Sequence, residues 1–135
     1  MKVPIKGVKF FSSIHDVKRK TYGEIFLPIG ILIAYLISNG PNINYLSSIL
    51  ILTISDPLSG ILSDLKPSDR NSILSFLVFF LSTLTILLVI YGQGKFIYII
   101  LLAIIITVTE RVSLLGTDNL SIPLVSNVLL KLLHM

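Results

Sequence analysis

Carboxylates are the side chains of this chain that are best suited to chemistry. The chain has 135 residues, of which 53% are hydrophobic and only 13% are charged. A carboxylate in or near hydrocarbon is energetically costly, so an apolar chain that keeps several of them is expected to use them. The acidic residues are Asp16, Glu24, Asp56, Asp64, Asp69, Glu110 and Asp118.

Asp56 follows an apolar run and stands directly before Pro57. Asp is favoured at a helix N-cap and Pro in the first helical turn, so we expect the helix to break here and a new half-helix to begin at Pro57. Broken helices at membrane depth occur around cavities or in the protein interior. The alternative is a simple kink that Asp56 caps. We favour a functional Asp56, because a purely structural Asp after an apolar run is a costly choice.

Two helix faces can be read from the spacing of small residues, which allow helices to approach closely in lipid. In one apolar segment, Ala103, Thr107 and Glu110 share a face that is expected to look into the bundle. There Glu110 either pairs with a basic residue or holds a cation. In an earlier segment, the small residues of one stripe are Ser48, Ser55, Ser59 and Ser63.

Asp118 and Asn119 stand where a helix is expected to begin. This pair combines metal ligands with backbone amides that suit phosphate. The alternative is a loop and a helix start that Asn119 or Ser121 caps.

The segment that contains Arg19 and Lys20 stands directly before the first apolar segment. Thr21 and Glu24 have the spacing of a capping box, and the two basic residues are also typical of positive-inside anchors. This segment therefore has a structural explanation as well as a chemical one.

Taken together, these groups suit phosphoryl transfer. That reaction needs carboxylates to hold Mg²⁺, cations on the phosphate oxygens and a carboxylate that accepts the proton of the attacking hydroxyl. A cytosolic nucleotide and a lipid alcohol would meet at the membrane surface, where these residues cluster.

The elements that must position these residues are apolar helices separated by short polar turns. A membrane-spanning helix needs about 20 residues. The predicted segments are residues 25–38, 43–62, 72–91, 96–109 and 122–133. We predict an all-α fold, a polytopic transmembrane helical bundle of four or five short helices in one domain, residues 21–135. A basic cytoplasmic juxtamembrane arm, residues 1–20, precedes it.

The distribution of Lys and Arg predicts the orientation of this bundle. The first twenty residues hold six of the eleven basic residues, and we expect this arm to lie against anionic lipid head groups. The N-terminus, the loop 64–71 and the stretch 110–121 are predicted to be cytoplasmic, which places all acidic residues near one face. A nucleic-acid partner is not expected, because the arm has no aromatic stacking series. The absence of cysteine excludes disulfides and thiolate metal sites.

Three segments resemble the CTP-dependent lipid-alcohol kinases, a family that includes dolichol kinase, phytol kinase and the yeast-type diacylglycerol kinase. Residues 19–28, RKTYGEIFLP, resemble that family's RK-[TS]-YGE-x-x-[FL]-P segment. Residues 56–60, DPLSG, resemble its D-[AP]-x-A segment. Glu110 together with residues 118–124, DNLSIPL, resembles its E…DNL-[ST]-[VI]-PL segment. The resemblance runs in order from about residue 15 to 125.

The resemblance implies a membrane-embedded kinase that transfers the γ-phosphoryl group of CTP to a polyprenol-like or diacylglycerol-like alcohol. Asp56, Glu110 and Asp118 would then hold Mg²⁺ or act as the base. Asn119 would assist as a metal ligand, and Glu24 would orient a basic pair. The residues expected to contact the nucleotide are Arg19, Lys20, Lys66 and Arg70.

The chain departs from the family pattern after Asp56. Family members usually continue with a Gly-rich, basic stretch and a K-[ST]-x-E-G-S motif, whereas residues 61–71 are short and residues 71–76 read NSILSF. Two alternatives follow. A cytidylyltransferase that acts on a lipid phosphate would use the same nucleotide, although the matches outside this region argue against it. A non-catalytic scaffold or subunit is favoured by the missing motif. A homodimer is also compatible with this sequence, because the chain has only four or five predicted helices.

Overall fold

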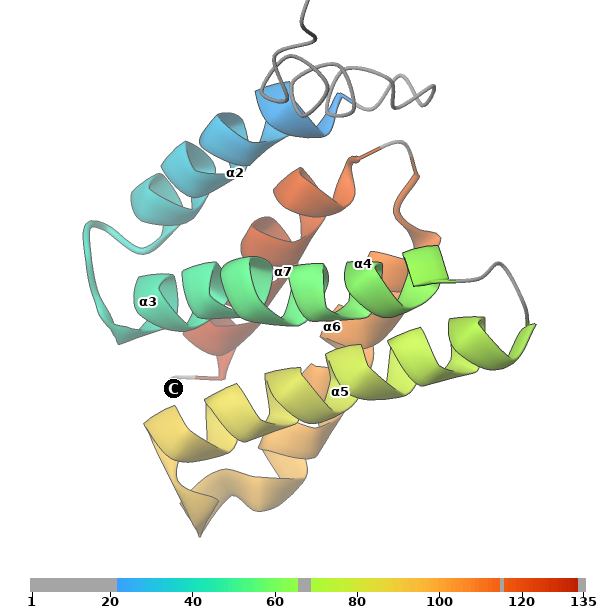
Figure 1. Ribbon diagram of the computed structural model, residues 1–135. Coiled ribbons are helices and arrows are strands. Elements are labelled where there is room, and N and C mark those ends of the chain that lie inside the picture. Colours follow the sequence, from blue (N-terminus) through green and yellow to red (C-terminus); the bar gives the residue numbers. More distant parts are fainter. Residues whose placement is uncertain (1–21, 66–68, 115, 134–135) are drawn as a thin grey trace, which may run out of the picture.

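The computed structural model describes residues 22–65, 69–114 and 116–133, without the side chains of residues 69–71. This part of the chain is helical and contains no strand (Figure 1). The predicted basic arm lies outside it. The elements are α2 (Gly23–Ile37), α3 (Ile43–Leu50), a π-helical turn (Ile51–Ser55), α4 (Asp56–Leu65), α5 (Asp69–Tyr91), a 3₁₀ turn (Gln93–Lys95), α6 (Phe96–Val112) and α7 (Asp118–Leu132).

The first helices end where the predicted turn residues stand. Asn39 and Gly40 follow α2 with φ angles of 58° and 110°, and this left-handed backbone ends the helix. Asn42 then caps α3, because its side chain accepts two backbone N–H groups of that helix at 3.0 Å each. Gly92, with a φ angle of 70°, makes the turn after α5. The turns expected between residues 38 and 43 and between residues 91 and 96 are therefore confirmed.

The helix around Asp56 is continuous, so the prediction of a broken helix with Asp56 as its N-cap is wrong. The chain passes from α3 through the π-helical turn into α4, and Asp56 has helical φ and ψ angles of −65° and −51°. A proline inside an α-helix lacks an N–H donor, and its ring collides with the carbonyl four residues earlier. A π-helical turn is wider than an α-helical one. The widened turn before Pro57 thus accommodates the ring without ending the helix.

The polar stretch between the last two apolar segments is more helical than predicted. α6 continues to Val112, and α7 begins at Asp118. Thr117 occupies the N-cap position of α7 and makes no side-chain cap bond. The prediction that Asn119 or Ser121 caps this helix is therefore wrong, since both lie inside it. The earlier start lengthens α7 to 15 residues.

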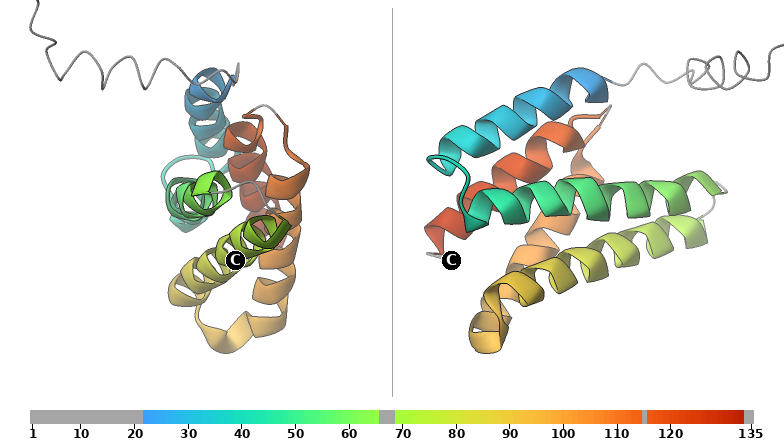
Figure 2. Two further views of the ribbon diagram at one scale, coloured as in Figure 1. Left: turned by 45° about the vertical axis from the view of Figure 1, so that its right-hand side comes forward. Right: turned by 60° about the vertical axis from the view of Figure 1, so that its left-hand side comes forward.

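Successive helices run in alternate directions, so their ends gather at two opposite ends of the bundle (Figures 1 and 2). The start of α2, the end of α4 and the loop between α6 and α7 lie at one end, on the right in Figure 1. The turns 38–42 and 92–95 and the end of α7 lie at the other. α2 packs along α7, α5 packs between α4 and α6, and α6 also contacts α7. This arrangement places the start of α7 beside the start of α2.

The predicted stripe of small residues forms the contact with α5. Ser55 and Ser59 are buried, whereas Ser63 at the end of α4 is exposed. The hydroxyl of Thr83 donates to Ser55 Oγ at 3.1 Å, and the hydroxyl of Ser75 donates to the Ser59 carbonyl at 2.9 Å. These bonds satisfy polar groups between two apolar helices, as expected for close packing in lipid.

Two helices are long and apolar enough to cross a membrane, by length and composition. They are Ile43–Leu65, with 23 residues, and Ser72–Tyr91, with 20. Only 33% and 22% of the residues in their most apolar stretches are buried inside the protein, so much of their apolar surface faces outward. Large apolar side chains such as Val89 and Ile97 are exposed. The apolar helix α2 is shorter, with 15 residues. The predicted four or five spans are thus not confirmed as a set.

Candidate functional site

The three predicted carboxylates come from three different elements and lie near one another. Asp56 begins α4, Glu110 lies near the end of α6, and Asp118 begins α7. All three side chains are half-buried. The charge of Asp56 interacts with the charges of Asp118 and Glu110, and Glu110 interacts with Asp118. The fold therefore brings into electrostatic contact groups that are far apart in the sequence.

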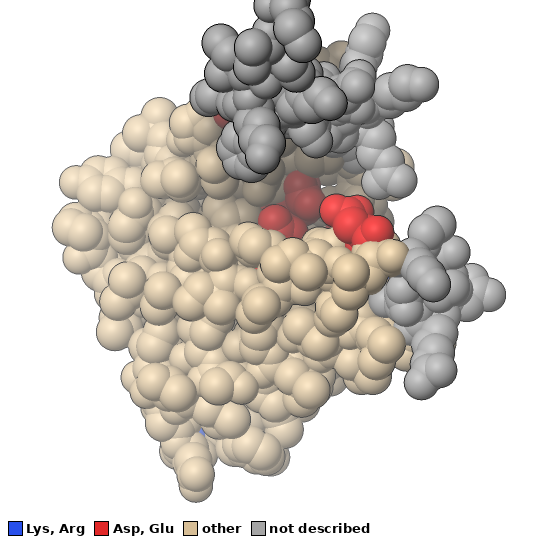
Figure 3. Space-filling model, viewed as in Figure 1, with Lys and Arg blue, Asp and Glu red and all other residues tan. Residues whose placement is uncertain are grey.

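Acidic side chains gather in a hollow of one face of the molecule, above α4 in the view of Figure 3. Among the described residues, no Lys or Arg side chain shows in this hollow in that view. Like charges that lie together disfavour each other's ionised forms, unless a cation lies among them. The carboxylates of this hollow therefore repel one another, and the guanidinium of Arg111 offsets part of this repulsion at Glu110.

The carboxylates do not form a ready-made metal cage. Within the described chain, no three His, Asp or Glu side chains stand close enough together to hold one ion by themselves. Mg²⁺ in phosphoryl-transfer sites is usually held by one or two carboxylates together with waters and substrate phosphates. The oxygen donors present thus suit Mg²⁺ in kind, and a nucleotide would have to complete the coordination.

Glu110 faces the bundle, as its spacing predicts, because Ala103 and Thr107 on the same face are fully buried. Burial raises the pKa of the Glu110 carboxyl, the guanidinium of Arg111 lowers this pKa, and the charge of Asp118 raises it. The raised pKa makes Glu110 a better proton acceptor than an exposed Glu when it is ionised.

Arg111 is a basic residue of this region that the sequence analysis did not place in the site. Its guanidinium donates a hydrogen bond to the hydroxyl of Ser72 near the start of α5. The bond links the end of α6 to the region that follows the charged loop. The only sequence signal was its position next to Glu110, and that position alone does not tell which element Arg111 reaches.

Asn119 joins the start of α7 to the start of α2. Its side-chain Nδ2 donates to the carbonyl oxygen of Gly23 at 3.2 Å. Its backbone N–H donates to Oδ1 of Asp118 at 2.9 Å. One residue thus contacts both a candidate catalytic carboxylate and the helix that follows the segment of Arg19 and Lys20.

Glycines allow the backbones of α2 and α7 to approach closely at this junction. A Cβ added at Gly23 would lie 2.8 Å from Asn119 Nδ2, and a Cβ added at Gly30 would overlap the Asn119 carbonyl oxygen. Gly116 has a φ angle of 85°, and a Cβ there would lie 2.7 Å from the Gly23 nitrogen. These positions have no room for a side chain. The sequence analysis assigned them no role, because one sequence does not show what a glycine contacts.

The structure does not show the other residues that were predicted to contact the nucleotide close to the carboxylates. Arg19, Lys20 and Lys66 lie outside them, and so does the side chain of Arg70, whose backbone belongs to the first turn of α5. Glu24 lies in the first turn of α2 with its side chain exposed. The predicted role of these residues on phosphate stays a prediction.

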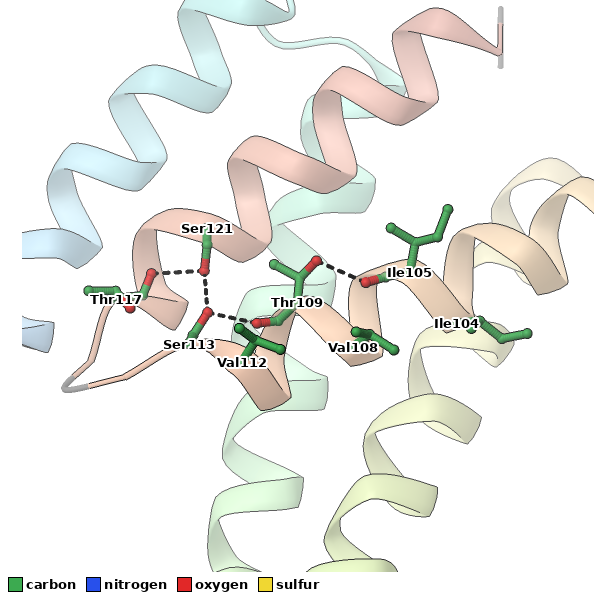
Figure 4. Close-up of a pocket in the computed structure, with 8 residues that line it drawn as sticks. All are labelled: Ile104, Ile105, Val108, Thr109, Val112, Ser113, Thr117 and Ser121. Carbon is green, nitrogen blue, oxygen red and sulfur yellow. Dashed lines mark hydrogen bonds between the residues drawn. The ribbon is translucent and has the colours of Figure 1, made fainter.

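A separate groove of about 610 Å³ lies between α6 and the start of α7 (Figure 4). Hydroxyl groups line one end of the groove, where the Oγ atoms of Ser113 and Ser121 lie 2.6 Å apart. Aliphatic side chains line the rest. None of the predicted catalytic residues lines it. Its lining residues are Ile104, Ile105, Val108, Thr109, Val112, Ser113, Thr117 and Ser121.

Comparison with protein-family models, with curated proteins and with solved structures gives no match for this chain.

Proposed function

We propose that this protein is a membrane-embedded kinase that transfers a phosphoryl group from CTP to a lipid alcohol of the polyprenol or diacylglycerol kind. The observation that carries the proposal is the electrostatic contact among Asp56, Glu110 and Asp118. These carboxylates belong to the same segments whose sequence resembles the CTP-dependent lipid-alcohol kinases. Two apolar helices of spanning length agree with an integral membrane location.

The proposed reaction is a direct displacement at phosphorus. The hydroxyl oxygen of the lipid forms a bond to the γ-phosphorus, and the bond from that phosphorus to the bridging oxygen breaks, so that CDP leaves. One carboxylate of the three accepts the hydroxyl proton. Glu110 is a candidate for this role, because burial raises the pKa of its carboxyl.

The remaining carboxylates, Asp56 and Asp118, would hold Mg²⁺, which neutralises charge on the phosphate oxygens when it is bound. Basic side chains would contact the same oxygens from the α2 side, where Arg19 and Lys20 precede the helix in sequence. Lys66, in the segment between α4 and α5, and Arg70, at the start of α5, would do so from the other side. The described part of the hollow in Figure 3 is acidic. A nucleotide is also negatively charged, and these basic side chains would balance its charge.

The proposed orientation places this end of the bundle in the cytoplasm. CTP is a water-soluble substrate, and the end that bears the starts of α2 and α7 is the end where the acidic and basic segments of the sequence meet. Lipid alcohols would reach the site from the bilayer. The exposed apolar surfaces of the long helices suit contact with lipid.

The test is phosphoryl transfer by the purified protein in lipid nanodiscs. Reactions would contain γ-labelled CTP or ATP with Mg²⁺, and a panel of polyprenols, diacylglycerols and lipid phosphates. We expect label in a lipid-alcohol product with CTP, and none when EDTA is present. In parallel reactions with α-labelled CTP, label in a lipid product would instead identify the cytidylyltransferase alternative. Absence of turnover and of CTP binding would favour the non-catalytic alternative.

A further inference from the structure

We infer that Asn119 acts as a positioning residue, which ties the start of α2 to the start of α7. The catalytic consequence of this inference rests on the proposed function. The tie itself rests on the contact between Asn119 Nδ2 and the carbonyl oxygen of Gly23, at 3.2 Å. A carbonyl oxygen accepts only, so the amide must present its NH₂ group to it.

The surroundings of Asn119 fix this contact from both sides. The Asp118 carboxylate accepts the backbone N–H of Asn119, the next residue in the chain, at 2.9 Å. Gly23 is buried, and the loop backbone at Gly116 lies so close that a Cβ there would stand 2.7 Å from its nitrogen. The start of α2 therefore has little freedom to move away from α7 while the bond is formed.

The tie limits where the predicted phosphate-binding residues can be. Lys20 precedes Gly23 by three residues, and three residues of extended chain span about 10 Å. If Arg19 and Lys20 bind the nucleotide as proposed, anchoring the Gly23 carbonyl near Asp118 would favour their approach to a nucleotide at the carboxylates. A looser junction would separate the basic groups from the acidic ones without removing either.

Two substitutions of Asn119 separate positioning from metal ligation. Asn119→Ala removes both the donor and the ligand oxygen, whereas Asn119→Asp removes the donor and keeps a better metal ligand. If the residue positions α2, both variants should raise the KM for CTP about fivefold, the usual effect of one lost hydrogen bond. The Mg²⁺ concentration for half-maximal rate at saturating CTP and the KM for lipid should not change. If Asn119→Asp keeps the KM for CTP of the wild type while Asn119→Ala weakens Mg²⁺ dependence, the inference is overturned.

Gly23→Ala tests the same bond from the other helix. The new Cβ would displace the amide of Asn119, so this variant should reproduce the fivefold rise in KM for CTP. Combined with Asn119→Ala, it should add little, because both changes remove one interaction. Full additivity would contradict a shared contact. Lys131→Met is the matched control, since Lys131 Nζ donates to the Ile37 carbonyl at 2.9 Å and ties α7 to α2 at the opposite end.

A distance measurement tests the tie without any enzyme assay. The chain has no cysteine, so spin labels can be attached to Tyr22→Cys and Leu114→Cys, two exposed positions on either side of the junction. Asn119→Ala should broaden the distribution of label distances, and Lys131→Met should not. An unchanged distribution in Asn119→Ala refutes the tie. If wild-type protein uses no CTP but the distribution broadens, the kinase proposal fails and the tie stands.

Discussion

The carboxylates of Asp56, Glu110 and Asp118 are held together by the packing of the helices that carry them. Each is half-buried, the charges of Asp118 and Glu110 act on Asp56, and the charge of Asp118 acts on Glu110. Removing one partner of a buried ion pair usually destabilises a protein, but removing one member of a group of like charges relieves repulsion. Function and stability should therefore respond in different ways to the same substitution.

Replacing Asp118 or Asp56 by Asn should lower the rate of CTP-dependent lipid phosphorylation by about 10²-fold or more, the usual range for loss of a group that acts in proton transfer or on the metal. The melting temperature in detergent should stay the same or rise. Both quantities can be measured on the same preparations. Asp64→Asn is the control, because Asp64 is an exposed carboxylate on the same helix as Asp56. Full activity of the Asp56→Asn variant would show that Asp56 has no role in the reaction.

Arg19→Ala should weaken the use of nucleotide more than the use of lipid. The planar guanidinium of Arg forms paired hydrogen bonds with phosphate oxygens, which suits it to a nucleotide. We expect the KM for CTP to rise about tenfold, as for the loss of a charge-assisted hydrogen bond, with little change in the KM for lipid. Steady-state kinetics with each substrate varied in turn would measure both. An equal rise in the two constants would point to a general loss of structure.

At the scale of elements, the pairing of α2 with α7 sets the shape of the site. The two helices touch through backbone atoms at one end and through a buried polar group at the other. There Asn127, which is fully buried, donates to the Ala34 carbonyl at 2.8 Å and shares hydrogen bonds with the Ser38 hydroxyl. Close backbone approach requires residues without side chains, so the glycines of this interface bear directly on stability.

Gly30→Ala and Gly60→Ala should have opposite effects on stability. A Cβ at Gly30 would overlap the Asn119 carbonyl oxygen, whereas nothing lies within 4 Å of a Cβ at Gly60. Overpacking at Gly30 should cost about 2 kcal/mol. Alanine at Gly60, inside α4, should stabilise the helix by up to about 1 kcal/mol. Thermal denaturation of both variants in one detergent would show the difference, and equal shifts would contradict the close contact of α2 with α7.

The sequence was sufficient for the helices but not for their junctions. Asn39, Gly40 and Gly92 adopt backbone conformations that end helices, so the turns were predictable from residue type. Pro57 indicated a missing hydrogen bond, yet a break, a kink and a widened turn all satisfy that condition, and the last is present. Asn119 was considered as a helix cap but lies inside α7, where its side chain bonds to Gly23. Such contacts depend on the packing of distant segments, which local spacing does not encode.

At the scale of the whole molecule, the outer surface is as informative as the interior. Apolar side chains remain exposed along the two long helices, while the hydroxyls of Thr83 and Ser75 on α5 donate to Ser55 and Ser59 of the neighbouring helix. This is the distribution expected when the solvent is lipid, since polar groups in hydrocarbon must find partners inside the protein. In the proposed membrane location, the bundle would present its apolar surface to the bilayer and its polar helix ends to water.

Single-cysteine labelling should show that the two ends of the bundle face opposite sides of the membrane. The chain has no cysteine of its own, so each substitution gives one label site. Ser68→Cys and Leu114→Cys should react with a membrane-impermeant maleimide only from the cytoplasmic side, and Gln93→Cys only from the other, following the bias of Lys and Arg. Permeabilised membranes serve as the control for reactivity. Labelling of Ser68→Cys from outside would separate the acidic segments by the membrane and end the shared-site proposal.

The described chain enters at one end of the bundle, at the start of α2, and leaves at the other, at the end of α7. On the proposed topology, these two points lie on opposite sides of the bilayer. A tandem gene duplication that joined two such units by a short linker would therefore insert the second unit upside down. Its acidic end would open to the opposite compartment, and the product would be a pair of inverted-topology repeats, an arrangement well known among transporters. Two copies with the same orientation would have to arise from separate chains or through an additional crossing.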